Sequence, residues 1–193
     1  AIVVSMAGRP EPRAVVGAAG NPLFAEELAL AIRDGADARS LPLTVEGAVQ
    51  ARLDRLTTQQ KDLLKRASIV GPRFWTEALV SIGEPDAARL LIELRHKDLV
   101  TPSPDSRLAG CREWSFRHGL VREVCLGLLT DSQRRELHEH AASWLGQMPG
   151  APPEDVAAHY RHAAKHDVAR PCWVRATTEA RARWPWGPRR RAR

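Results

Sequence analysis

Aromatic residues, cysteines and long apolar runs are all scarce in this sequence. Aromatic residues make up 5% of the 193 residues, and tyrosine occurs once. The three cysteines, Cys111, Cys125 and Cys172, are far apart and form no Cys-x-x-Cys pair, so neither a zinc site nor a disulfide framework is indicated. No run approaches the roughly 20 apolar residues that span a bilayer, and the starting AIVVSMAG lacks the basic residues of a signal peptide. We therefore expect a cytoplasmic protein without membrane contact.

The sequence also lacks the motifs on which common enzyme chemistry depends. It contains no Gly-x-x-x-x-Gly-Lys-Ser/Thr loop to hold nucleotide phosphates and no apolar strand that ends in paired acids to hold Mg²⁺. Gly-x-Ser-x-Gly is absent, and no Ser-His-Asp or Cys-His set stands out. Cys125 lies on an apolar stripe and is expected in the core. We therefore predict that the chain is not an enzyme and that any ATPase activity would need an upstream domain.

Basic charge is concentrated at the end of the chain. The formal net charge is +6, but residues 170–193 contain eight arginines and a single acid, Glu179, so the other 169 residues carry a net charge of −1. A folded nucleic-acid reader usually carries its cations on the reading surface. We therefore expect only non-specific nucleic-acid contact, made by the Arg-rich tail and weakened by salt.

Hydrophobic spacing predicts a mostly α fold whose first part contains a winged helix. Asn21 is the natural N-cap of the first helix, Pro22 fits its first turn, and Gly35 ends it. Three helices followed by a small β-hairpin are the element order of a winged helix, here over about 41–118. The expected helices span 13–35, 44–56, 59–68, 75–82 and a segment from about 86, and the expected strands lie within 1–12 and over 98–101 and 111–118.

The second part of the chain is predicted to form α-helical hairpins. Apolar stripes favour helices after Gly119, after a cap at Asp131 or Ser132, and over two further segments that end near residue 183. These helices have the pattern of the start of a helical-repeat array, which usually needs about three repeats for stability. Residues 184–193, WPWGPRRRAR, have no periodicity and are expected to be disordered.

Histidines gather in this second part. His159, His162 and His166 fall at spacings of three and four, on one face of an expected helix. His138 and His140 are two apart, face different directions and cannot chelate a metal from one helix. No carboxylate or cysteine joins either group at a fitting spacing, so we predict no metal site.

Five segments occur in an order and at spacings that are typical of one family. They are GNPLFAEEL, LPLTVEGAVQARLDRL, WSFRHGLVREVCLGLL, SQRRELHEHAASWL and AAHYRHA. Together they resemble, over roughly residues 20–182, the C-terminal part of the ATPase module of STAND-type bacterial signalling proteins. That family includes LuxR-type regulators and ATPases linked to cyclases or kinases. The resemblance implies a remnant of the nucleotide-binding and helical-lid region at 1–40, a winged helix at 41–118, a tetratricopeptide-like start at 119–183 and a basic tail at 184–193.

The resemblance also implies a nucleotide site. By the family pattern, Gly20, Asn21 and Pro22 would pack against adenine. His118 would lie near the β-phosphate of ADP, and Arg9 would sense the γ-phosphate. The simpler alternatives are a capped helix start, a hydrogen-bonded histidine at a strand end and a surface arginine. The implied cofactor is ATP or ADP, bound weakly by this chain alone, with no metal.

Two departures from the family pattern bear on this site. The aspartate that follows the histidine in the family motif is Gly119 here. Only ten residues separate Pro10 from Asn21, where the family has a long helical stretch. Most of the helical lid is therefore expected to be missing.

The main hypothesis is a non-catalytic regulatory fragment of a STAND-type protein that couples nucleotide state to protein–protein interaction. Its helical repeats would bind a protein partner or associate with a second copy. One alternative is a winged-helix DNA-binding regulator, although its reading helix, about 86–96, carries Arg89, Arg95 and His96 but no Asn or Gln. Another is an inert truncated product, since WPWGPRRRAR resembles out-of-frame GC-rich coding.

Overall fold

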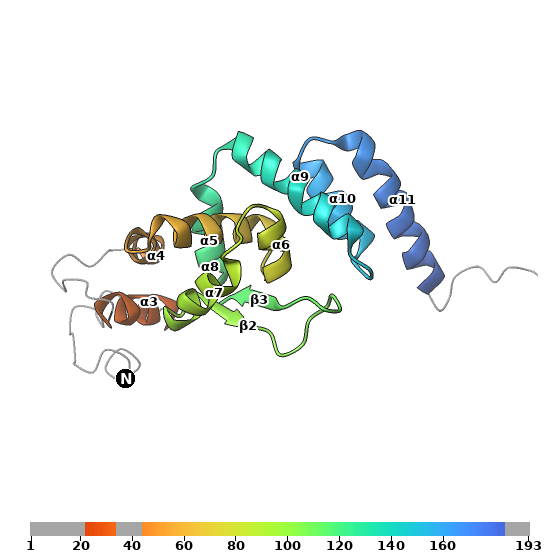
Figure 1. The fold of residues 1–193 in the computed structure, drawn as a ribbon. Helices are drawn as coiled ribbons and strands as arrows, with labels where there is room; N and C mark the ends of the chain where they lie inside the picture. Colours follow the sequence, from red (N-terminus) through yellow and green to blue (C-terminus); the bar gives the residue numbers. More distant parts are fainter. Residues whose placement is uncertain (1–21, 34–43, 184–193) are drawn as a thin grey trace, which may run out of the picture.

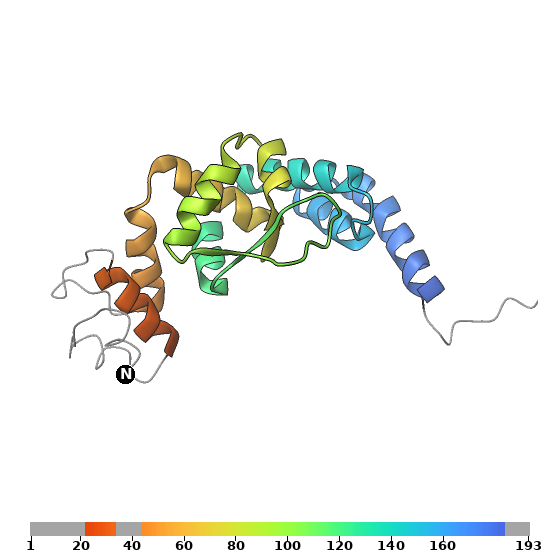
Figure 2. The same cartoon turned by 60° about the horizontal axis from the view of Figure 1, so that its bottom comes forward.

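The computed structural model describes residues 22–33 and 44–183 (Figures 1 and 2). The helices within these ranges are α3 (Pro22–Arg33), α4 (Val45–Asp54), α5 (Thr58–Val70), α6 (Thr76–Ser81), α7 (Ala87–His96), α8 (Gly119–Gly127), α9 (Asp131–Gln147), α10 (Pro153–His162) and α11 (His166–Arg183). The strands are β1 (Arg73–Trp75), β2 (Val100–Pro102) and β3 (Glu113–Phe116). The prediction of a mostly α fold with a small sheet is confirmed.

Several sequence predictions lie outside the described residues. They are the strand within 1–12, the first part of the helix predicted over 13–35, the disordered tail at 184–193, and the roles given to Arg9, Gly20 and Asn21. Within the described ranges, no helix combines the length and the apolar character that crossing a bilayer requires.

The three short strands form one antiparallel sheet in the order β1-β3-β2. The central strand is β3, in which Trp114 lies opposite Phe74 of β1 and Phe116 lies opposite Val100 of β2. The rings of Phe74 and Phe116 are 5.2 Å apart and form part of the core beneath the sheet. The sheet therefore ties the segment after α5 to the hairpin that follows α7.

Strand β1 is a correction to the sequence prediction, which begins a helix at Trp75. Gly71-Pro72 ends α5, as predicted, but the next three residues are extended because they pair with β3. The helix α6 begins only at Thr76. Local spacing does not reveal a strand of three residues whose partner lies about forty positions further along the chain.

Threonine side chains start two of the longer helices. Thr57 begins α5, and Thr130 begins α9 by accepting a hydrogen bond from the backbone of Gln133. In both helices the side-chain oxygen of the glutamine three positions later accepts a hydrogen bond from the backbone N–H of the threonine. The two reciprocal bonds make a capping box. The sequence prediction of Asp131 or Ser132 as the cap of α9 is therefore wrong, because the hydroxyl that accepts lies one position earlier.

One apolar core extends from α4 through α8 and on to α9 and α10. Trp75 contacts Trp144 of α9 with ring centroids 5.8 Å apart, so the sheet packs directly on the last helices. The helix α10 lies against both α9 and α11, and the short connections make these neighbours antiparallel (Figure 1). Fully buried leucines form the centre of this core, among them Leu63, Leu64, Leu79, Leu90, Leu91 and Leu94.

The helix α3 is attached differently from the other helices. It lies against α4 at the end of the molecule opposite α11 (Figures 1 and 2). Its buried Phe24, Leu28 and Ala29 form a small cluster with Ala48 of α4, separate from the main core. Little apolar surface therefore holds α3, and polar contacts have a larger share in its position.

Candidate functional site

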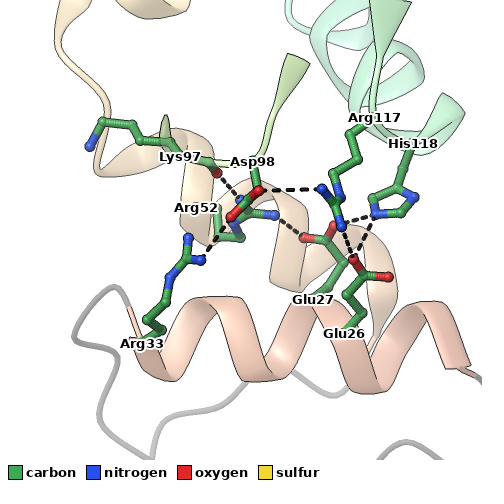
Figure 3. A network of polar contacts seen from close by, with 8 residues as sticks. All are labelled: Glu26, Glu27, Arg33, Arg52, Lys97, Asp98, Arg117 and His118. Carbon is green, nitrogen blue, oxygen red and sulfur yellow. Dashed lines mark hydrogen bonds and ion pairs between the residues drawn. The ribbon is translucent and has the colours of Figure 1, made fainter. Parts of the chain in front are cut away.

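Glu27 and Arg52 form a fully buried ion pair at the centre of a polar network around α3 (Figure 3). Arg52 Nη1 donates to Glu27 Oε2 over 2.6 Å, and the two side chains are 2% and 0% exposed. Through Nη2, the same guanidinium donates to the carbonyl oxygen of Lys97 over 2.6 Å. Each buried charge is tolerated because the other supplies its partner. The pair therefore joins α3, α4 and the end of α7.

The local sequence turns both charges inward. Glu27 lies three residues after the buried Phe24 of α3, and residues three apart share a helix face. Arg52 lies three residues after the buried Val49 of α4 in the same way. The start of α4 is set by Thr44, whose side chain caps the helix. Both charged residues thus sit on the apolar faces along which the two helices meet.

Asp98 and Glu26 extend the network toward the surface (Figure 3). Asp98 accepts from Arg33 Nη1 over 2.7 Å and lies 3.3 Å from Arg117 Nη1. Arg117 Nη2 donates to Glu26 Oε1 over 3.0 Å. These side chains are partly exposed, so each pair contributes only about 0–1 kcal/mol. Their effect is geometric, since they tie the second and the last turns of α3 to the loops beside β2 and β3.

His118 occupies the N-cap position of α8 with its ring turned toward α3 (Figure 3). Its Nε2 atom lies 3.5 Å from Glu26 Oε1 and 3.9 Å from Glu27 Oε1. His118 Nε2 and Glu27 Oε1 are both buried, and neither makes a hydrogen bond within the described structure. The imidazole therefore faces carboxylates, directly beside the buried ion pair.

Among the described residues, the network pairs acids with arginines. Three carboxylates, of Glu26, Glu27 and Asp98, face three guanidinium groups. Such an arrangement can hold α3 firmly against two loops, and its described arginines are all engaged by carboxylates. Across residues 22–33 and 44–183, no group of three His, Cys, Asp or Glu side chains could hold a metal ion.

Two of the residues assigned to a nucleotide site are described. Pro22 is the exposed first residue of α3, and Glu26, which His118 contacts, lies one helical turn after it. The structure therefore brings His118 to the first half of α3. Arg9, Gly20 and Asn21 are outside the described residues.

The sequence analysis did not identify the acidic and basic side chains that surround His118. A signal was present for Glu27 and Arg52, because each interrupts the apolar face of its helix at a spacing of three. A charge on an apolar face indicates a buried partner but does not say which residue provides it. No comparable signal existed for Asp98 or Arg117, which follow a helix and a strand.

A second polar cluster lies between α9 and α10. His138 Nδ1 is 2.9 Å from His159 Nδ1, and the rings of His138 and His162 stack with centroids 4.8 Å apart. The prediction that His159, His162 and His166 share one helix face is wrong. The helix α10 ends at His162, Ala164 has a positive φ of 61°, and His166 begins the next helix. The sequence did not indicate the contacts of His138 with His159 and His162, because they cross between two helices.

Two members of the histidine cluster, His138 and His159, have lowered pKa values that favour their neutral form. Burial is the main cause that lowers the pKa of His138 to about 3, and the nearby His159, His162 and Arg122 contribute to the same shift. Burial likewise lowers the pKa of His159 to about 4, although a hydrogen bond with the backbone of Val70 opposes the shift. At neutral pH these side chains pack as uncharged groups, and in acid their protonation should lower the stability of the fold.

Comparison of the chain with protein-family models, with curated proteins and with solved structures finds no match.

Proposed function

We propose that this chain is a non-catalytic regulatory part of a STAND-type ATP-binding signalling protein, and that it couples nucleotide state to protein–protein interaction. The observation that carries the proposal is the polar network that fastens α3 to the rest of the chain (Figure 3). The helix α3 follows the Gly-Asn-Pro segment, and the network connects it to the histidine that the resemblance places near the nucleotide. A change at the start of α3 would thus reach α4, β2 and α8 through specific contacts.

The element order supports the winged-helix part of this proposal. Helices α5, α6 and α7 precede the β2–β3 hairpin, and β1, between α5 and α6, pairs with β3. This is the order expected of a winged helix, and these elements share one apolar core. The antiparallel helices α9, α10 and α11 that follow are consistent with the start of a helical repeat, which offers a surface to a protein partner.

The described residues do not by themselves fit a phosphate group. His118 Nε2 faces the carboxylates of Glu26 and Glu27, and the nearby guanidinium groups are engaged by carboxylates. An anion placed at His118 would be repelled by both acids. The nucleotide part of the proposal therefore rests on the sequence resemblance, which assigns the site to Arg9, Gly20, Asn21, Pro22 and His118, and we expect binding by this chain alone to be weak.

A titration of the purified chain with a fluorescent ADP analogue tests the proposal. We expect saturable binding with a Kd of roughly 1 mM. His118→Ala should weaken binding several-fold, whereas Glu26→Gln should strengthen it because one repelling carboxylate is removed. Lys61→Gln, a charge change on an exposed helix face of α5, serves as the matched control and should leave the Kd unchanged.

The absence of saturation at roughly ten times that concentration would reject nucleotide sensing by this chain. Equal binding by the wild type, His118→Ala and Glu26→Gln would reject the assignment of the site to this end of α3. In either case the polar network would serve only to hold α3 in place.

The DNA-binding alternative is disfavoured by the surface of α7. Arg89 is engaged by Glu93 over 2.6 Å and lies 3.4 Å from Asp86, so part of the positive charge of this helix is neutralised. A reading helix needs free donors for bases and phosphates. We expect no sequence-selective DNA binding in fluorescence anisotropy, and any affinity should fall steeply with salt. Sequence-selective binding that persists at high salt would favour the alternative.

A further inference from the structure

Beside the end of α10, α11 carries an apolar surface that no other described helix covers. The helix lies at one end of the molecule in both views (Figures 1 and 2). Trp173 is 38% exposed and Val174 is 60% exposed, and together with Ala169 they form the floor of a shallow groove of about 460 Å³. Large exposed apolar side chains gathered in a groove indicate a contact surface. We call it the α11 groove.

The α11 groove is bordered by positive charge. Arg161, from the end of α10, and Arg170, from α11, both line it. Neither arginine forms an ion pair with any described residue, whereas Arg175, elsewhere on α11, lies 3.6 Å from Glu179. Tryptophan and arginine are the side chains most often found at the energetic centres of protein interfaces. The groove thus combines an apolar floor with two cations that have no acidic partner within residues 22–33 and 44–183.

Charge repulsion disfavours two alternative occupants of the α11 groove, the C-terminal segment of this chain and a second copy of it. The Arg-rich segment 184–193 has the same sign as Arg161 and Arg170 and would be repelled. A second copy that met the groove face to face would bring the same arginines together. The complementary occupant is a segment with acidic side chains at the edges of an apolar stripe.

We propose that the α11 groove binds an acidic amphipathic helix of a partner protein. Apolar side chains of that helix, spaced three and four residues apart, would cover Trp173 and Val174, and its carboxylates would pair with Arg161 and Arg170. Arg161 at the end of α10 borders the groove, and residues of α11 form the rest of its lining. This inference does not depend on the nucleotide part of the proposed function, because the groove lies at the other end of the molecule from α3 (Figure 2).

Fluorescence anisotropy of the full chain with a labelled synthetic peptide tests the inference. The probe is a helix of about four turns made of Glu, Leu and Ala, with one leucine stripe and glutamates beside it. A peptide in which Lys replaces every Glu, and a peptide of the same composition with the stripe scrambled, are the controls. We expect saturable binding of the Glu peptide in the range of about 10–100 µM, and at least about tenfold weaker binding of both controls.

Substitutions in the chain locate the site. Arg161→Gln combined with Arg170→Gln should weaken binding about tenfold, and Trp173→Ala by at least as much. Arg175→Gln is the matched control, since it removes one charge from the same helix outside the groove, and it should change the Kd by less than about twofold. Far-UV circular dichroism of each variant verifies that α11 is still folded.

Several outcomes would overturn the inference. One is failure of the Glu peptide to saturate at about 1 mM, and another is an equal effect of Arg170→Gln and Arg175→Gln. Tight binding of the chain to vesicles rich in phosphatidylserine, lost in Trp173→Ala, would show that the groove serves a membrane instead. A dimer in sedimentation equilibrium that dissociates in Trp173→Ala would show that a second copy covers it.

Discussion

Replacing Arg52 by methionine would leave the carboxylate of Glu27 in the interior without its cation. The Glu27 side chain is fully buried, its Oε1 atom already makes no hydrogen bond within the described structure, and Oε2 would lose the 2.6 Å contact. Removal of one partner of a buried pair typically costs about 3–5 kcal/mol. We expect Arg52→Met to lie in this range, and Glu27→Leu to cost less, because Arg52 keeps its bond to the Lys97 carbonyl oxygen.

The double variant is the informative one. With Glu27→Leu and Arg52→Met together, neither charge of this buried pair remains, and both new side chains lie beside the apolar cluster of Phe24 and Leu28. Such a replacement is often neutral or stabilising. We therefore expect the double variant to lie within about 1 kcal/mol of the wild type and the coupling energy to exceed about 2 kcal/mol.

Hydrogen exchange of the α3 amides is the assay, with urea unfolding in parallel. Since α3 is held by a small apolar cluster, the single variants should release α3 before the main core unfolds. A loss of 3 kcal/mol would lower protection of α3 by about a hundredfold. Lys61→Met, in an exposed pair with Asp54, is the control and should cost less than about 1 kcal/mol. The reasoning is refuted if the double variant loses as much protection as the two single variants combined.

Two further predictions concern the core. The folded-state pKa values of His138 and His159, about 3 and about 4, lie below the unfolded value of about 6.5, so the unfolded chain binds more protons as the pH falls through this window. The free energy of unfolding should keep its full value above about pH 6.5. At lower pH each histidine should reduce it by up to about 1.4 kcal/mol per pH unit, and the partly exposed His138 by less. Urea midpoints measured from about pH 7 down to about pH 4 test this dependence. The variant His138→Gln should make the midpoint depend less on pH. An unchanged pH dependence, or an equal reduction by the exposed His140→Gln, would contradict the assignment of the effect to His138. Thr76→Val should cost about 1–3 kcal/mol, because Trp114 Nε1 donates to the Thr76 hydroxyl over 3.0 Å in the interior and would lose its acceptor. Thr76→Ser keeps the hydroxyl and should recover most of the urea midpoint, so equal losses in both variants would argue against the hydrogen bond.

The sequence by itself determined most of the helices. Apolar spacing places α4, α5 and α7 within a few residues of their observed ends, since the period of 3.6 records which face of a helix is buried. Gly71-Pro72 ends α5 as predicted, because proline cannot continue the hydrogen-bond pattern. These features depend on residues close together in the chain, which is why a single sequence is enough to predict them.

Only the tertiary structure decided which residues meet. Glu27 and Arg52 are 25 residues apart, and His138 and His159 are 21 apart. Periodicity shows that such side chains lie on buried helix faces, but the partner depends on how the helices pack against each other. The strand β1 has the same origin, since Arg73–Trp75 is extended only because β3 lies beside it. Local sequence thus fixes the faces of the elements, and the free energy of burying those faces together selects the pairs that form the candidate site.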